Sequence, residues 1–553
     1  MVLQQASSVA SLSGSDILTP MEIPPVNFLN ILLAAAPLLL VLYLMIGRQW
    51  QGNQAGVAGW VAAAGLAVLF FGAGLDLLLV AWGRAVLLAL YVLYIIWTAL
   101  LFYHVVNEAG VVQRMRQIMP AFAPDRLTQA LLLGWLFASF LQGASGFGVP
   151  AAIVAPLLVG LGFAANQAVI IALIGHAWSV TFGSLGSSFL ALMAATGLPG
   201  AALAGTSALL LGFSCLLCGL GTVWVAAGLD GLRQRWHSVI GLALLMSAVQ
   251  WGLATTGLWT LAAFGAGFVG ISAGIAHFRL GWLEFGGRRR AAAGAPKTEP
   301  ANQVSGRMLL SIFFPYLLLV IVIVVGQLLL AKPLDVVQLN FNFPEVRTTY
   351  GWTVAAGEGR SISIFGHAGA LLLYSSMLAF VWFRWRGLPD AGALPEKRYQ
   401  GRAIVRKTVQ GSVKSTVAIM ALVAMAVTMQ HAGMTQLLAQ ALSSTGHIFP
   451  FLSPFIGALG AVMTGSNTNS NVIFAQLQQQ TGLALHLSLP LILAAQTTGG
   501  ALGGMFAPAK VIIGCSTVPG SDDGKVLKAV TAYGMVMVAL VGLVVWGVTL
   551  LQK

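Results

Sequence analysis

Charged residues are scarce in this chain. Asp, Glu, Lys and Arg make up only 8% of its 553 residues, against 58% hydrophobic residues, whereas a soluble chain carries about 25% charged residues. Apolar runs near 20 residues recur and match the roughly 30 Å thickness of bilayer hydrocarbon. They do not alternate apolar with polar residues as barrel strands do. The sequence therefore excludes a soluble globular protein and predicts an all-α polytopic membrane protein embedded in a lipid bilayer.

Cysteine is also scarce. Cys215 and Cys218 have the spacing of a redox motif but lie inside an apolar run, where we expect small packed side chains. With Cys515 as the third cysteine, no disulfide framework, metal cluster or cofactor is expected. The first 27 residues contain no Lys or Arg, so the charged region of a cleavable signal is missing. We expect residues 28–47 to remain as an anchor.

The net charge of +13 indicates membrane topology rather than nucleic-acid binding. The basic residues gather in short loops between apolar runs, above all in 108–126, 229–237, 278–307 and 384–414. Placing all four loops in the cytoplasm makes the spans alternate correctly. The N-terminus and the 331–365 loop then lie outside.

About 12–14 transmembrane helices are predicted from the apolar runs. The candidate spans are residues 28–47, 55–73, 77–107, 127–141, 149–163, 166–190, 200–228, 238–253, 258–277, 308–330, 366–383, 415–433, 448–463, 472–508 (in two pieces) and 528–550. The predicted organisation is an extracytoplasmic segment (1–27), scaffold helices (28–126), a first repeat (127–228), middle helices (229–447) and a second repeat (448–553).

Two short interruptions of glycine and small polar residues break the apolar runs. They are LQGASGFGVP at 141–150 and TGSNTNSN at 464–471. Within hydrocarbon, unwound backbone persists only where protein or a watery cavity satisfies its polar groups. A matched pair of such interruptions is the best sequence pointer to a transporter's substrate site. In the topology above, the first is entered from the cytoplasm and the second from outside.

Each interruption is followed about thirty residues later by a further small-residue stretch. These stretches are TFGSLGSS at 181–188 and TGGALGGM at 498–505. The identical pairs are Thr181/Thr498, Gly183/Gly500, Leu185/Leu502 and Gly186/Gly503. Together with entry from opposite faces, this echo predicts two inverted repeats, each with a re-entrant hairpin and a broken helix.

Three segments carry a resemblance to a known family: FLQGASGFGVPAAIVAPLLVGLGF (140–163), FLSPFIGALGAVMTGSNTNSNVIFAQLQ (451–478) and AAQTTGGALGGMFAP (494–508). They resemble the L-lactate permease family of bacterial secondary transporters. The resemblance implies uptake of L-lactate, glycolate and related 2-hydroxy monocarboxylates with protons across the cytoplasmic (inner) membrane. Members usually carry Glu, Asp and Lys where this chain has Gln142, Asn467 and Gly504, so these three motif charges are missing.

The two interruptions suit a small carboxylate because half-helix N-termini offer partial positive charge and free N–H groups. Hydroxyl and amide side chains at the same depth could bind the substrate hydroxyl. The candidate substrate-binding residues are Gln142, Gly143, Ser145, Gly146, Gly148, Thr464, Ser466, Asn467, Thr468, Asn469, Asn471, Thr497 and Thr498. The alternative is that these residues only permit close helix packing and cap helix ends.

The sequence does not decide whether the coupling ion is H⁺ or Na⁺. All fifteen acidic residues fall at predicted span ends or in loops, so no intramembrane carboxylate is expected to carry a proton. His176 is a coupling candidate because imidazole titrates near neutral pH, or else it is a packing residue. Lys510 could replace the Lys missing at position 504, although we favour a positive-inside residue heading the 509–527 loop.

Two other functions stay open. A sodium-coupled transporter of another organic anion, such as a dicarboxylate, would use the Asn and Thr oxygens of the second interruption as cation ligands. An intramembrane serine protease is the remote alternative, because Gly143 to Gly146 match a GxSG pattern and Ser145 could pair with His176. It leaves the second interruption unexplained, so we expect a transporter and no enzyme. The scaffold helices could also form a homodimer contact.

Overall fold

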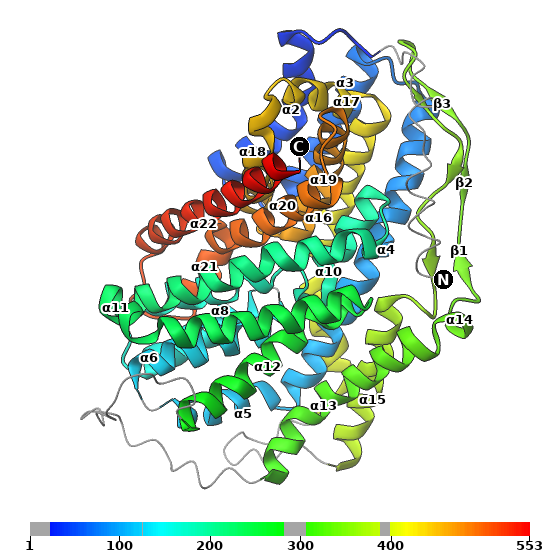
Figure 1. The fold of residues 1–553 in the computed structure, drawn as a ribbon. Helices are drawn as coiled ribbons and strands as arrows, with labels where there is room; N and C mark the ends of the chain where they lie inside the picture. Colours follow the sequence, from blue (N-terminus) through cyan, green and yellow to red (C-terminus); the bar gives the residue numbers. More distant parts are fainter. Residues whose placement is uncertain (1–22, 124, 147, 281–305, 387–398, 553) are drawn as a thin grey trace.

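The computed structural model describes residues 23–552 except Pro124, Phe147, 281–305 and 387–398. Most of the predicted N-terminal segment and the centres of two basic loops lie outside the described residues. Within them, twelve helices are long and apolar enough to cross a membrane, or thirteen if one bent pair counts as a span. The predicted polytopic helical architecture is confirmed (Figure 1).

The first part of the chain contains helices α2 (Phe28–Leu42), α3 (Gly52–Phe70), α4 (Leu75–Glu108), α5 (Val111–Ile118), α6 (Arg126–Gln129), η3 (Ala130–Phe137), α7 (Ala138–Ala144), α8 (Val149–Gly160), α9 (Ala165–His176), η4 (Ala177–Ser179), α10 (Gly183–Thr196), α11 (Gly200–Thr255) and α12 (Trp259–Leu280). The second part contains α13 (Gly306–Val324), α14 (Ala331–Leu334), α15 (Ala368–Arg386), α16 (Gly401–His431), α17 (Met434–Ser443), α18 (Phe449–Thr464), α19 (Asn467–Ala484), α20 (Leu489–Gly503), η8 (Gly504–Phe506), α21 (Pro508–Ser516) and α22 (Asp523–Leu551).

The predicted spans 200–228 and 238–253 are confirmed as separate helices, because the single label α11 covers two helical arms joined at a break in the helical conformation. The arms lie antiparallel: the Ser247 hydroxyl donates to the Gly212 carbonyl at 3.3 Å, and a Cβ at Gly219 would lie 2.8 Å from Val239. The charged stretch 229–237 between them is helical and not the loop that the sequence predicts. In the structure Asp230 and Arg233 lie 3.8 Å apart on successive turns of the helix, a spacing that a helix surface accommodates. The chain reverses direction at Ala227 and Gly228, where the backbone leaves the helical conformation and the glycine adopts a φ of +60°.

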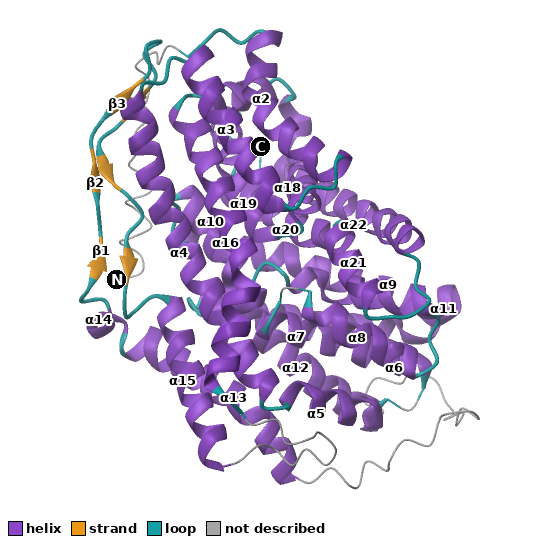
Figure 2. Ribbon diagram, turned by 180° about the vertical axis from the view of Figure 1, so that it is seen from behind, coloured by secondary structure: helices purple, strands orange, loops and turns teal. Residues whose placement is uncertain are grey.

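The predicted outer loop 331–365 folds into a β-ribbon that the sequence patterns did not predict. Its strands are β1 (Gln338–Leu339), β2 (Asn342–Phe343), β3 (Val346–Arg347), β4 (Thr353–Val354), β5 (Gly357–Glu358) and β6 (Ile362–Ser363). They pair antiparallel and nested, as β1–β6, β2–β5 and β3–β4, so together they form one interrupted hairpin. The ribbon runs along one flank of the helices (Figure 2). It is held to α4 by bonds such as Tyr94 Oη to the Ile364 carbonyl, 3.0 Å.

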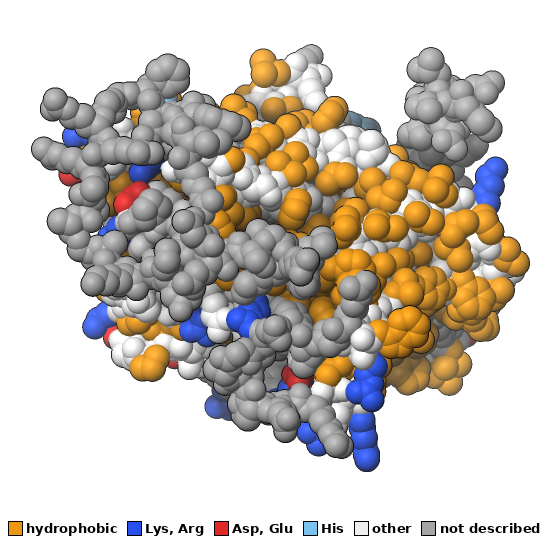
Figure 3. Space-filling view, turned by 90° about the horizontal axis from the view of Figure 1, so that it is seen from below, with side chains coloured by type: hydrophobic (Ala, Val, Ile, Leu, Met, Phe, Trp, Pro, Cys, Tyr) orange, Lys and Arg blue, Asp and Glu red, His pale blue; other side chains and the backbone are white. Residues whose placement is uncertain are grey.

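The outer surface is rich in exposed apolar side chains. Phe28, Leu75 and Trp385 are 82%, 73% and 85% exposed, and hydrophobic side chains spread over much of one flank when the molecule is viewed from below (Figure 3). Apolar exposure on this scale is unfavourable in water but suits contact with lipid chains. The surface therefore agrees with a molecule that spans a bilayer.

Contacts between loops show which of them share an end of the molecule. The predicted cytoplasmic loops meet one another, because Glu108 forms an ion pair with Lys407 and Asp125 lies 3.2 Å from Arg235. At another place, the ribbon meets the α3–α4 turn through a bond from the Thr349 amide to the Gly72 carbonyl. These contacts agree with the alternation inferred from the basic residues.

Glycines set how closely each hairpin packs on its broken helix. A Cβ at Gly499 of α20 would overlap the Pro454 carbonyl of α18, and one at Gly175 of α9 would overlap the Gly134 carbonyl of η3. Small residues at such crossings let helix backbones approach closely inside a membrane. Both hairpins therefore pack on their broken helices through a glycine at the helix crossing.

We expect Gly499→Ala to separate α18 from α20 and to destabilise the folded protein. The methyl group would overlap a backbone carbonyl, which cannot rotate away, and overpacking of this kind typically costs ~1–3 kcal/mol. Thermal unfolding of the purified protein in detergent measures the effect. Gly547→Ala is the control, because a Cβ there meets nothing within 4 Å. Equal unfolding temperatures for the two variants would contradict the packing account.

Candidate functional site

The two predicted interruptions are the tips of helical hairpins with the same local structure. At the first tip the Ser145 hydroxyl donates to the Leu141 carbonyl at 2.7 Å, and Gly146 has a φ of +63°. At the second, the Thr464 hydroxyl donates to the Gly460 carbonyl at 2.8 Å, and Gly465 has a φ of +68°. Glycine is favoured where the chain must turn left-handed directly after a helix.

A new helix begins directly after each tip. Ser466 caps α19 by accepting the Asn469 amide at 3.3 Å. Gly148, with a φ of +81°, precedes α8 and makes no side-chain cap bond. The first N–H groups of a helix have no partner inside it and carry partial positive charge. Two such helix ends therefore lie at the centre of the protein.

The broken helix beside the first tip contains an unusual turn. Ser184, Leu185 and Gly186 adopt φ values of +48°, +55° and +80° in succession, a left-handed conformation that strains residues other than glycine. A Cβ at Gly146 would overlap the Ser184 hydroxyl. The turn therefore packs directly against the hairpin tip, and glycine at position 146 is required by contact as well as by conformation.

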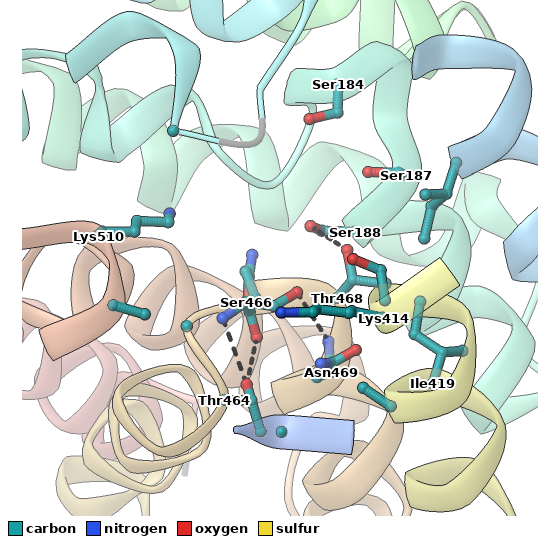
Figure 4. Close-up of a pocket in the computed structure, with 18 of the residues that line it drawn as sticks. Ser184, Ser187, Ser188, Lys414, Ile419, Thr464, Ser466, Thr468, Asn469 and Lys510 are labelled. Atoms are coloured by element: carbon teal, nitrogen blue, oxygen red, sulfur yellow. Dashed lines mark hydrogen bonds between the residues drawn. The ribbon is translucent and has the colours of Figure 1, made fainter. Parts of the chain in front are cut away.

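A cavity of about 480 Å³ lies where the hairpin tips, α10, α16 and α21 meet (Figure 4). It contains eight of the predicted residues: Gln142, Gly148, Thr464, Ser466, Asn467, Thr468, Asn469 and Lys510. It also contains polar residues that the sequence analysis did not select: Gln51, Asn53, Ser184, Ser187, Ser188, Ser412, Lys414 and Ser415.

Two lysines line the cavity from different walls. Lys510 extends from α21 and Lys414 from α16, and Figure 4 shows both ends directed into the cavity. None of the described lining residues is Asp or Glu. A Cβ at Gly504 would lie 2.8 Å from the Lys510 ammonium, so this ammonium lies beside the position where the resemblance led us to expect a lysine. Our preferred interpretation of Lys510 as a loop residue is wrong, because it belongs to α21.

Amide side chains join the second tip to the first broken helix. Asn467 Nδ2 donates to Thr181 Oγ1 at 3.1 Å, and Thr181 in turn bonds the Thr497 carbonyl at 3.1 Å. Asn471 Nδ2 donates to Thr497 Oγ1 and to the Ser188 carbonyl, both at 2.9 Å. Segments 283–316 positions apart are thereby fixed together behind the cavity.

Several predicted binding residues lie away from the cavity wall. Gly143 packs against the backbone of Phe264 in α12, and Ser145 borders a separate small space beside Tyr316. The others outside the wall are Gly146, Asn471, Thr497 and Thr498, all buried. They support the tips rather than line the space. Periodicity could not separate these roles because hairpin tips are not regular helices.

The structure gives no support to a serine–histidine pair. The His176 ring bonds the carbonyl of Ala172 through Nδ1 at 2.6 Å, and the Ser145 hydroxyl is directed to Leu141. No hydrogen bond joins Ser145 to His176 in the described part of the chain. His176 is 1% exposed and is not among the residues that line the cavity.

Lys414 and the serines were missed for identifiable reasons. The predicted span began at residue 415, so Lys414 was assigned to a basic loop, whereas α16 starts at Gly401. Ser187 and Ser188 belong to the small-residue stretch at 181–188, whose pattern predicts a repeat but carries no separate signal of a binding site. A basic residue one position before an apolar run is the signal that could have identified Lys414.

The fold and the cavity define a polytopic α-helical membrane protein with a polar, positively charged internal site. The sequence model described as L-lactate permease matches residues 30–551, and this chain belongs to the L-lactate permease family. Its family indicates a transporter rather than an enzyme, as the sequence predicted.

The chain is similar to several named proteins over most of its length. It is 27% identical to an L-lactate permease of Bacillus subtilis, covering 89% of this chain and 90% of that one. It is 25% identical to an L-lactate permease of Escherichia coli (94% and 95%) and 24% identical to the glycolate permease GlcA of the same species (95% and 96%). Among solved structures, the YdaH transporter of Alcanivorax borkumensis aligns with a TM-score of 0.39 and 13% identity over 82% of this chain and 84% of that one.

The cavity should attract anions to a cysteine placed on its wall. Ser415 lines the cavity beside Lys414 and is half-buried. In a background without native cysteines, we expect Ser415→Cys to react faster with an anionic than with a cationic methanethiosulfonate, each rate being divided by that of a free thiol. Adding Lys414→Gln should reduce the preference. Ser214→Cys, buried in α11, is the unreactive control. A cationic preference at Ser415→Cys would contradict a positive cavity.

Proposed function

We propose that this protein is a secondary active transporter of L-lactate, glycolate or related 2-hydroxy monocarboxylates in the bacterial cytoplasmic membrane. The observation that carries the proposal is an internal cavity with two lysines, many hydroxyl and amide groups and no acid among its described lining residues. Such a cavity offers a carboxylate cationic partners and a hydroxyl its hydrogen bonds. The names of its relatives, L-lactate permease and glycolate permease, support the same substrate class.

The carboxylate is assigned to Lys510 and the start of α19. Asn467 and Thr468 occupy the first turn of α19 and line the cavity, so their backbone N–H groups belong to the set that needs partners outside the helix. Gln142 and the serines of α10 are then the partners for the 2-hydroxyl group. In this arrangement Lys414, on the exposed side of the cavity, attracts the anion as it enters.

Alternating access by two inverted repeats, at 127–228 and 448–553, is the transport mechanism we propose. Both segments contain a hairpin with a left-handed glycine at its tip, then an interrupted helix, then a long helix. The residues paired by sequence do not occupy equal positions, however. Thr181 follows the short turn η4, whereas Thr498 precedes η8. The hairpin geometry, rather than that echo, therefore supports the repeat.

Sodium-coupled transport of a dicarboxylate is a second candidate. Two ammonium groups on separate walls could each bind one carboxylate of a dianion. In addition, Asn467 Oδ1, Asn471 Oδ1 and Thr498 Oγ1 are buried without a hydrogen-bond partner in the described structure. Unpaired amide and hydroxyl oxygens are hard ligands of the type that alkali cations accept. This candidate uses the same cavity and differs in cargo and coupling ion.

Uptake into proteoliposomes separates the two candidates. Radiolabelled L-lactate, glycolate and succinate are supplied with proton and sodium gradients imposed separately. Uptake of the two monocarboxylates driven by a proton gradient supports the first candidate, and sodium-driven uptake of succinate supports the second. Transport of none of the three under either gradient would contradict both.

Removing the cation beside the second tip should impair uptake. We expect Lys510→Gln to lower kcat/KM for L-lactate by at least about tenfold, because a hydrogen bond to a charged group contributes ~1.5–3 kcal/mol. Asn467→Ala and Gln142→Ala should also cripple uptake while membrane expression persists. Lys528→Gln, on the exposed surface of α22, is the matched control for loss of one lysine. Full activity in Lys510→Gln would overturn its role at the site.

A carboxylic acid returned to the cavity should strengthen proton dependence. The Gln142 side chain is 3% exposed, and burial disfavours a charged carboxylate there. We therefore expect Gln142→Glu to respond to an inward proton gradient more strongly than wild type. Gln142→Asn keeps the position neutral and controls for disturbed packing. Equal gradient responses in all three proteins would show that residue 142 has no part in coupling.

A further inference from the structure

A second cavity, here called the ribbon vestibule, lies between the β-ribbon and the ends of α10 and α16. Its volume is about 460 Å³. Arg84 of α4 and Arg360 of the ribbon line it, together with Trp352, Glu358 and His431. Glu358 is exposed on β5, whereas His431 is 3% exposed. The inner part of the vestibule is therefore cationic and polar, and its one described acid lies at the rim.

Three nitrogen donors in this cavity are left without partners. The Nε atoms of Arg84 and Arg360 and the indole nitrogen of Trp352 are buried and make no hydrogen bond in the described structure. Arginine and tryptophan nitrogens can only donate, so their missing partner must be an acceptor. A buried donor without a partner costs about 1–3 kcal/mol. An anion placed among them would remove that cost.

His431 adds a hydrogen-bond acceptor to these donors. Its Nδ1 lies 2.9 Å from the Val427 carbonyl, and a carbonyl only accepts, so Nδ1 carries the proton. In the neutral ring Nε2 is then an acceptor, and it too is buried without a partner. A hydroxyl group could donate to it. The vestibule thus combines donors for a carboxylate with an acceptor for an alcohol.

The vestibule lies on the same two helices as the central cavity. Ser188 of α10 lines the central cavity and Ala194 lines the vestibule, a separation of six residues or ~9 Å of helix. Likewise α16 presents Lys414 and Ile419 to one cavity and Val427 and His431 to the other. A solute passing between α10 and α16 would move from one space to the next.

We propose that the ribbon vestibule is a second binding site, which captures a small 2-hydroxy carboxylate before it reaches the central cavity. Arg84, Arg360 and Trp352 bind the carboxylate, and His431 accepts the hydroxyl proton. The choice of a 2-hydroxy acid rests on the proposed function. The requirement for a small anion rests on the unpaired donors alone. On the topology inferred from the basic loops, this site faces the outside of the cell.

The test compares two arginines of the ribbon in proteoliposome uptake. We expect Arg360→Gln to raise KM for L-lactate at least about fivefold while kcat stays within about twofold, the pattern of lost initial binding. Arg347→Gln removes the same charge from an exposed site on β3 and should change neither constant. Arg360→Lys should restore part of the affinity, which a merely unfolded ribbon would not allow. An unchanged KM in Arg360→Gln would overturn the proposal.

A binding measurement keeps this test separate from the proposed function. If wild type transports neither L-lactate nor glycolate, the proposed function fails. L-lactate and sulfate are then titrated into the full-length protein in nanodiscs of zwitterionic lipid. Weaker binding of either anion to Arg360→Gln than to Arg347→Gln would still support an anion site. Equal binding, or none to wild type, would overturn it.

Discussion

A helix that ends inside a membrane leaves backbone N–H and C=O groups without partners, and hydrocarbon cannot supply them. The centre of this protein is organised around that need. At each hairpin tip a hydroxyl bonds the last helical turn and a left-handed glycine starts the return. The helix starts that remain unpaired point to a polar cavity. The same unpaired N–H groups that make broken helices costly thus supply the donors of the proposed anion site.

Hydrogen bonding changes along the second hairpin. Toward its base, Gln478 bonds both Ser453 and Gln496, and Gln496 bonds Ser470. These four side chains are buried at 0% exposure, and the bonds tie both arms of the hairpin to α20. Near the tip, by contrast, the Oδ1 atoms of Asn467 and Asn471 have no partner among the described residues. A satisfied network makes the base rigid, and the incomplete one leaves the tip able to accept a ligand.

Hydropathy and charge predicted most spans, both interruptions and about half of the polar residues that line the cavity, because bilayer thickness constrains helix length directly. The irregular parts of the backbone were harder to predict from the sequence. The left-handed run at Ser184 to Gly186 follows from tertiary contact with Gly146, which no local pattern encodes. Lys414 was missed because a helix can extend several turns beyond its apolar part, as α16 does. The β-ribbon has strands of two residues, too short to show alternation.

The pair of lysines has a consequence for the empty protein. Two like charges face one low-dielectric space with no described acid between them, and their repulsion grows as water is expelled. If the protein works by the alternating access proposed above, closure around an empty cavity is penalised, whereas a bound anion neutralises the repulsion and permits closure. A carrier of this kind would change slowly between its outward-facing and inward-facing states when empty, and quickly when substrate is bound. Such a protein would exchange internal for external substrate faster than it accumulates substrate from an empty interior.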